Sequence, residues 1–202
     1  MKRPVPDEVI LGLLESHPAH GYDLLESFRS NEKLGRMWNL STSQLYAVLK
    51  RLEDEGAIIG NRIQSPDGPA RIVYSVTAKG SDRLTSWLFE KTPSASVHRI
   101  RVLFLSRLYV ARLLEIKNEK IVEYQRNVCE KRLKNFLEDR NKLQTSFEKL
   151  TLDFIIGQLK SAITWLDNCE KELFKSSTEN IDLFEKTTHK KFQRNTRIIE
   201  EK

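Results

Sequence analysis

Two cysteines in 202 residues are too few for the disulfide framework of a small secreted domain. The sequence also has no run approaching the roughly 18 apolar residues that cross a bilayer. The first seven residues carry two prolines and no apolar segment, so we expect no signal peptide. These absences predict a cytoplasmic protein that works in a reducing compartment and has no membrane partner.

Catalytic and cofactor motifs are also missing. The sequence has no phosphate-binding loop, dinucleotide fingerprint, zinc-protease motif or nucleophile elbow. His17 and His20 are spaced closely enough to share a metal ion, but no third or fourth ligand accompanies them. We therefore expect no enzymatic activity, no metal and no cofactor.

Glycine and proline are scarce in the second half. Of eight glycines and six prolines, only Gly157 lies after residue 93. Because both residues disfavour helix interiors, this distribution predicts short elements over residues 1–92 and long helices over 93–175. Residues 176–202 are polar and predict a short helix or a disordered tail. The basic excess lies in the helical half, since residues 1–90 sum to −1 and residues 91–175 to +6.

The first 92 residues carry the element order of a winged helix-turn-helix. Helical patterns cover residues 5–15, 21–29 and 42–55, with Ser41 as N-cap and Gly56 as C-cap of the third. Strand patterns at 57–63 and 71–76 flank an Asp-Gly turn, and Thr77 is suited to cap a fourth helix. We expect a mainly α fold in which a winged helix-turn-helix with a two-stranded hairpin precedes a long-helix dimerisation domain.

The third helix presents two different faces. Leu45, Val48, Leu49 and Leu52 form one apolar stripe at helical spacing. The remaining surface has a small side chain at its centre and polar side chains around it. This arrangement suits a helix that reads base edges in a major groove. Its candidate base contacts are Ser43, Gln44, Ala47 and Lys50, with Tyr46 and Arg51 as candidate phosphate contacts. An ordinary amphipathic helix with a solvated face gives the same pattern.

The predicted hairpin adds two cations. Arg62 and Arg71 flank its loop, where their side chains could reach backbone phosphates. The hairpin would then be the wing of the motif.

Three segments resemble the PadR family of bacterial transcriptional regulators. They are His20–Leu24, Leu40–Gly56 and Arg71–Gly80, which occur in the family's order and spacing over residues 8–88. The chain departs from the family at Ala47, where proline is frequent, and at Gln44, where threonine or serine is common. The second half, around Trp165, resembles the longer-tailed subfamily that includes virulence-gene activators.

The resemblance implies a non-enzymatic, dimeric winged-helix protein that binds double-stranded DNA, often as a repressor. In that family the C-terminal helices form the dimer. Some members respond to phenolic or other aromatic small molecules, so a small aromatic effector is a possible partner.

The second half carries its own signals for association. We expect a helical run over residues 97–116, a long helix from about residue 118, and a further helix over 152–174. Val122, Cys129, Phe136, Leu143 and Leu150 recur every seven residues, which is typical of coiled-coil packing. The long helices could bury apolar surface against a second copy, or they could satisfy each other in a monomer.

Together these observations favour a sequence-specific transcriptional regulator, in the repressor role, that binds a palindromic operator as a homodimer. The alternative is a winged-helix module that binds another protein and no DNA. The near-neutral charge of residues 1–90 keeps this alternative open, because binding to phosphates is driven by charge.

Overall fold

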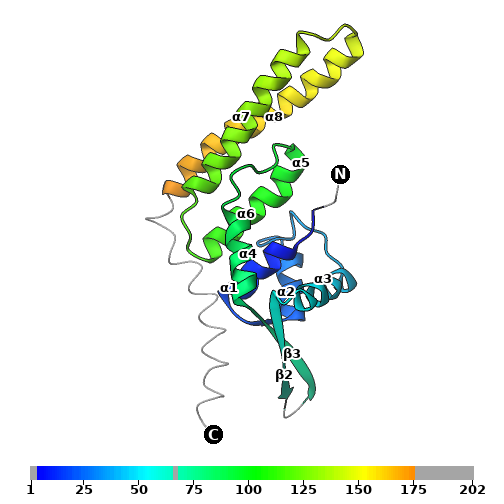
Figure 1. Cartoon of the computed structure of the whole chain (residues 1–202), viewed down its shortest axis with the longest axis vertical. Coiled ribbons are helices and arrows are strands. Elements are labelled where there is room, and N and C mark those ends of the chain that lie inside the picture. Colours follow the sequence, from blue (N-terminus) through cyan, green and yellow to red (C-terminus); the bar gives the residue numbers. More distant parts are fainter. Residues whose placement is uncertain (1–3, 66–67, 176–202) are drawn as a thin grey trace. The chain divides into compact units, whose positions relative to one another are not determined.

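The computed structural model describes residues 4–65 and 68–175 (Figure 1). The tail prediction for residues 176–202 falls outside these described ranges. The chain divides into two compact units, Met1–Ile163 and Thr164–Lys202. Its architecture is mainly helical, with a small three-stranded antiparallel sheet and long helices in the second half, which confirms the predicted fold class.

Three helices come first. They are α1 (Asp7–Ser16), α2 (Gly21–Arg29) and α3 (Thr42–Asp54), close to the predicted bounds. Their apolar stripes form one core, in which Ile10, Leu24 and Leu49 are almost fully buried. Helix α3 ends at Asp54, and its C-cap is Glu55 and not the predicted Gly56. Gly56 follows with a φ of +69°, a left-handed conformation that glycine adopts without steric cost.

The sheet has one strand more than predicted. Strands β2 (Ile58–Ser65) and β3 (Gly68–Val76) form the predicted hairpin and extend further toward its turn. A two-residue strand, β1 (Ala19–His20), pairs with β3 on its other edge, with His20 opposite Val73. The sheet thereby connects the start of α2 to the hairpin.

Helix α4 (Ala78–Leu88) follows the hairpin and is capped as predicted, because the Thr77 hydroxyl accepts a hydrogen bond from the Gly80 amide. The predicted helical run over 97–116 ends at residue 113 and is built from α5 (Val97–Arg99), the π-helical segment η1 (Ile100–Phe104) and α6 (Leu105–Leu113).

Helix α6 packs against α1. A Cβ on Gly12 would lie 2.4 Å from Val110, so glycine permits this close approach. The Trp38 indole also donates a 2.8 Å hydrogen bond to Ser106 on α6. These contacts join residues on both sides of residue 93. The predicted domain boundary at that residue stays a prediction.

The predicted single helix through residues 122–150 is wrong. Helix α7 (Glu119–Arg140) is followed by its C-cap Asn141, and α8 (Ser146–Lys175) begins after a short turn. The seven-residue series therefore breaks, since Leu143 lies in the turn and Leu150 lies on α8. Arg140 pairs with Asp153 across the turn. Leu133, earlier on α7, and Ile163, later on α8, line one groove. The two helices therefore run antiparallel over these residues.

None of the helices in residues 4–65 and 68–175 is long and apolar enough to cross a membrane.

Candidate nucleic-acid interface

Helix α3 begins with a capping box. The Ser41 hydroxyl accepts a hydrogen bond from the Gln44 amide at 3.3 Å, and the Gln44 side-chain oxygen accepts one from the Ser41 amide at 2.9 Å. Both bonds satisfy donors that a helix start leaves without partners. The cap fixes the first turn of α3, and it also uses the oxygen of the Gln44 side chain.

The predicted division of α3 into two faces is present in the structure. Leu45, Val48, Leu49 and Leu52 are buried. All six candidate residues on this helix are exposed outside this stripe: Ser43, Gln44, Tyr46, Ala47, Lys50 and Arg51. Because the centre of this surface carries only the methyl group of Ala47, another molecule can approach the helix closely.

Arg51, although exposed, also makes an intramolecular contact. Its guanidinium donates hydrogen bonds of 3.2 and 2.5 Å to the carboxylate of Asp7, which is almost fully buried at the start of α1. Asp7 also accepts a 3.1 Å bond from Arg83 on α4, and Arg83 pairs with Glu8 and Glu55. The hydrogen bond to Asp7 raises the pKa of Arg51. This network joins α1, α3 and α4.

Arg62 and Arg71 are exposed on the two strands of the hairpin. The strand register places Arg62 opposite Ile72 and Arg71 opposite Ile63. Since directly opposed residues of an antiparallel pair point to the same side, these two arginines point to opposite sides of the hairpin. The structure therefore does not bring them to one common surface.

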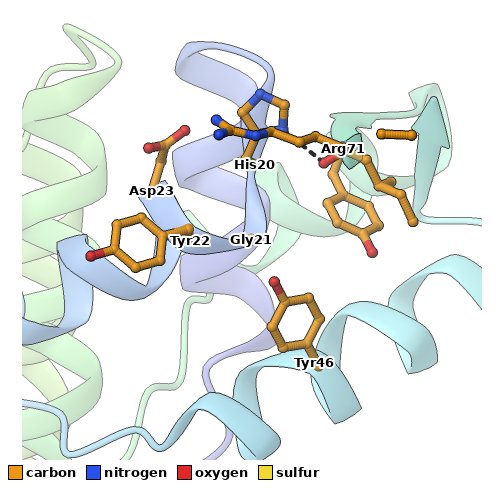
Figure 2. Close-up of a pocket in the computed structure, with 9 residues that line it drawn as sticks. His20, Gly21, Tyr22, Asp23, Tyr46 and Arg71 are labelled. Carbon is orange, nitrogen blue, oxygen red and sulfur yellow. Dashed lines mark hydrogen bonds between the residues drawn. The ribbon is translucent and has the colours of Figure 1, made fainter. Parts of the chain in front are cut away.

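A cavity of about 600 Å³ lies between α2, α3 and β3 (Figure 2). Two predicted site residues, Tyr46 and Arg71, line it together. The other lining residues are His20, Gly21, Tyr22, Asp23, Ala70, Ile72 and Tyr74. His20 is not among the DNA contacts predicted from the sequence, although it belongs to the His20-Gly21-Tyr22 motif.

Two details show how this cavity is built. A Cβ on Gly21 would lie 2.9 Å from the Tyr46 hydroxyl, so the phenol ring packs over the start of α2. Burial, with a smaller effect from Glu53, raises the pKa of Tyr74, which keeps its phenol protonated. The wall of the cavity thus combines aromatic surface with hydrogen-bond donors.

A second cavity, of about 740 Å³, lies between the segment Ser94–Arg101 and the helices α7 and α8. Arg101, Arg132 and His98 line it together with the apolar side chains of Phe136 and Ile155. The Arg132 guanidinium lies 4.3 Å from the centre of the Phe136 ring. Within the described ranges, no group of three or more histidine, cysteine or acidic residues could hold a metal ion.

Comparison with known proteins finds similarity over the N-terminal part. Residues 10–86 match the transcriptional regulator PadR-like family. The chain is 36% identical over 84 residues to the negative transcriptional regulator PadR of Bacillus subtilis, a stretch covering 42% of this chain and 45% of the relative. The chain thus spans about half the length of this curated relative. These matches support the resemblance to PadR regulators; the longer-tailed subfamily stays a prediction.

Solved structures are also similar. Bacillus subtilis PadR in complex with operator DNA is 23% identical, with 83% of this chain and 97% of that chain covered and a TM-score of 0.43. The same regulator in complex with p-coumaric acid is 24% identical, with 83% and 96% covered and a TM-score of 0.39.

Proposed function

We propose that this chain is a cytoplasmic transcriptional regulator that binds a palindromic DNA operator as a homodimer and represses transcription. The observation that carries the proposal is the exposed surface of α3, which has only a small side chain at its centre. The helix lies beside the hairpin, and a capping box fixes its first turn. The match of residues 10–86 to PadR-like regulators supports it, because this segment carries both elements.

Helix α3 would lie in the major groove. Ser43, Ala47 and Lys50 would approach the base edges, and the amide nitrogen of Gln44 could join them because the cap uses only its oxygen. Tyr46, Arg62 and Arg71 would contact backbone phosphates. Arg51 could do so only by leaving Asp7, so we propose that it positions α3 instead.

The homodimer is supported by an exposed apolar stripe on α8. Phe147, Leu150 and Phe154 lie at helical spacing and are 77%, 68% and 66% exposed. Large apolar side chains rarely gather on a surface that stays in water. We propose that a second copy of the chain covers them and holds two α3 helices about one DNA turn apart.

The repressor role is supported by the similarity, over 84 residues, to a negative transcriptional regulator. As a further partner we propose a small aromatic effector. The 740 Å³ cavity would hold its ring against Phe136 and an anionic group near Arg101 and Arg132. We also propose that the second half of the chain belongs to the longer-tailed subfamily that includes virulence-gene activators.

The alternative function is a winged-helix module that binds a partner protein and no DNA. The observation that favours it is the net charge of −1 over residues 1–90. A DNA-binding surface normally carries a local basic excess.

The test compares two DNA duplexes of equal length. One carries the sequence upstream of the protein's own gene, and the other carries the same bases in shuffled order. We expect tighter binding to the upstream duplex and a loss of affinity as salt rises. No binding to either duplex would favour the interaction module, and equal affinity for both duplexes would reject sequence-specific binding.

A pair of variants then tests the surface of α3. Lys50→Ala should weaken binding and lower the slope of log affinity against log salt by about one unit. Lys131→Ala removes the same charge from an exposed position on α7 and should change neither value. Equal effects of both variants would contradict the assignment of this face.

A further inference from the structure

We propose that the cavity between α2, α3 and β3 binds one phosphodiester group of the DNA backbone, and that His20 takes up a proton when it does so. This inference rests on the proposed function and adds a phosphate-binding residue and a proton linkage to it. The bond that forms is Nε2–H···O between the imidazolium of His20 and a phosphate oxygen, and the proton comes from the solvent.

The position of the cavity is the first argument. Tyr46 lines it from α3, and Ala70, Arg71 and Ile72 line it from the hairpin. If α3 lies in a major groove and the hairpin reaches the neighbouring minor groove, the backbone strand between the two grooves must pass between these elements. The phosphates of that strand would then pass the mouth of the cavity.

The hydrogen bond of His20 is the second argument. Its Nδ1 lies 3.0 Å from the carbonyl oxygen of Ile72, and this contact is drawn as a dashed line in Figure 2. A carbonyl oxygen can only accept, so Nδ1 carries a hydrogen and donates it. In the neutral ring the other nitrogen, Nε2, then has a lone pair and no hydrogen.

A phosphate oxygen can only accept as well. It can bond to Nε2 only if that nitrogen gains a proton, so binding of the anion and protonation of His20 favour each other. Histidine is the side chain whose charge ordinarily changes between about pH 5 and pH 8. The affinity for DNA should therefore fall as the pH rises through this range.

The charges around the cavity match a phosphodiester. The titratable groups that line it with His20 are Asp23 and Tyr22 from α2, Tyr46 from α3, and Arg71 and Tyr74 from β3. Protonated His20 and Arg71 together with ionised Asp23 sum to one positive charge, which balances the single charge of a phosphodiester. Free phosphate near pH 7 carries a larger negative charge, which Asp23 opposes more strongly.

The experiment measures the affinity of the full chain for the upstream duplex between pH 6 and pH 8.5 at constant salt. We expect the wild type to lose affinity with rising pH, with a slope approaching tenfold per pH unit for each proton taken up. His20→Asn can still donate to Ile72 but lacks Nε2, so its affinity should vary little with pH. His17→Gln removes a histidine that does not line this cavity and should keep the wild-type dependence.

A pH-independent wild type, or a His20→Asn variant that keeps the full dependence, would overturn the proposal while leaving DNA binding intact. No binding by the wild type at any pH would instead reject the proposed function itself.

A second measurement follows the imidazole signal of His20 by NMR in the wild type, so that it needs no variant to fold. DNA should raise the pH at which this signal titrates, and an unchanged midpoint would overturn the proposal. The same shift with inorganic phosphate alone would assign the cavity to free phosphate and overturn the claim for the DNA backbone.

Discussion

Replacing Arg51 by glutamine separates a structural role of this residue from a role in binding phosphate. The change removes the two hydrogen bonds that the guanidinium donates to Asp7. Hydrogen bonds to charged groups contribute about 1.5 to 3 kcal/mol each when buried. Two features reduce that figure here, because the Arg51 side chain is 42% exposed and Asp7 keeps its bond to Arg83.

We therefore expect Arg51→Gln to lower the free energy of unfolding by about 1 to 2 kcal/mol. In a chain of this length that corresponds to a fall in Tm of about 2 to 8 °C. The salt slope of DNA binding should stay unchanged, since the guanidinium does not reach the DNA. Calorimetry and a salt titration on the same sample would measure both quantities. An unchanged Tm with a slope lowered by one unit would refute this reasoning and make Arg51 a phosphate contact.

Three further changes test other parts of the account. Phe154→Glu should convert the proposed dimer to a monomer in sedimentation without unfolding the chain, whereas Asn127→Glu on α7 should not. A Phe154→Glu variant that remains dimeric would move the interface elsewhere. Gly21→Ala should displace the Tyr46 phenol and weaken DNA binding as much as Tyr46→Ala does, while Tm stays nearly unchanged. Wild-type affinity of the Gly21→Ala variant would show that the phenol does not contact DNA. Arg62→Ala should weaken binding equally for upstream and shuffled duplexes, and a loss confined to the upstream duplex would place its side chain in a groove.

The winged-helix part could be predicted from the sequence because its signals are local. The apolar stripe of α3, the Ser41 cap and the Asp-Gly turn each act within a few residues. Strand β1 could not be predicted, since it has two residues and exists only because His20 pairs with Val73, far along the chain. Strands of that length carry no pattern of their own.

The turn between α7 and α8 was missed because the seven-residue period of apolar residues continues across it. The period is a coincidence here, and the turn contains neither glycine nor proline. A signal was nevertheless present. Thr145 and Glu148 form a capping box, in which the Thr145 hydroxyl accepts from the Glu148 amide at 3.2 Å and the Thr145 amide donates to the Glu148 carboxylate at 3.2 Å.

The exposed face of α3 was predictable from helical geometry, but the partners of its side chains were not. Arg51 and Asp7 are 44 residues apart, so nothing local indicates that they pair. Likewise, Arg62 and Arg71 flank the hairpin loop in the same way in the sequence. Only the strand register shows that their side chains point to opposite sides of the hairpin.

The most direct test of the central claim is to select binding sites from a pool of random DNA duplexes with the purified full chain. The account predicts one enriched motif made of two inverted half-sites whose centres lie about 10 base pairs apart. Exchanging Gln44 or Lys50 should alter the preferred bases within each half-site. A pool that remains random after repeated selection, while the protein stays folded, would contradict the claim that α3 reads DNA.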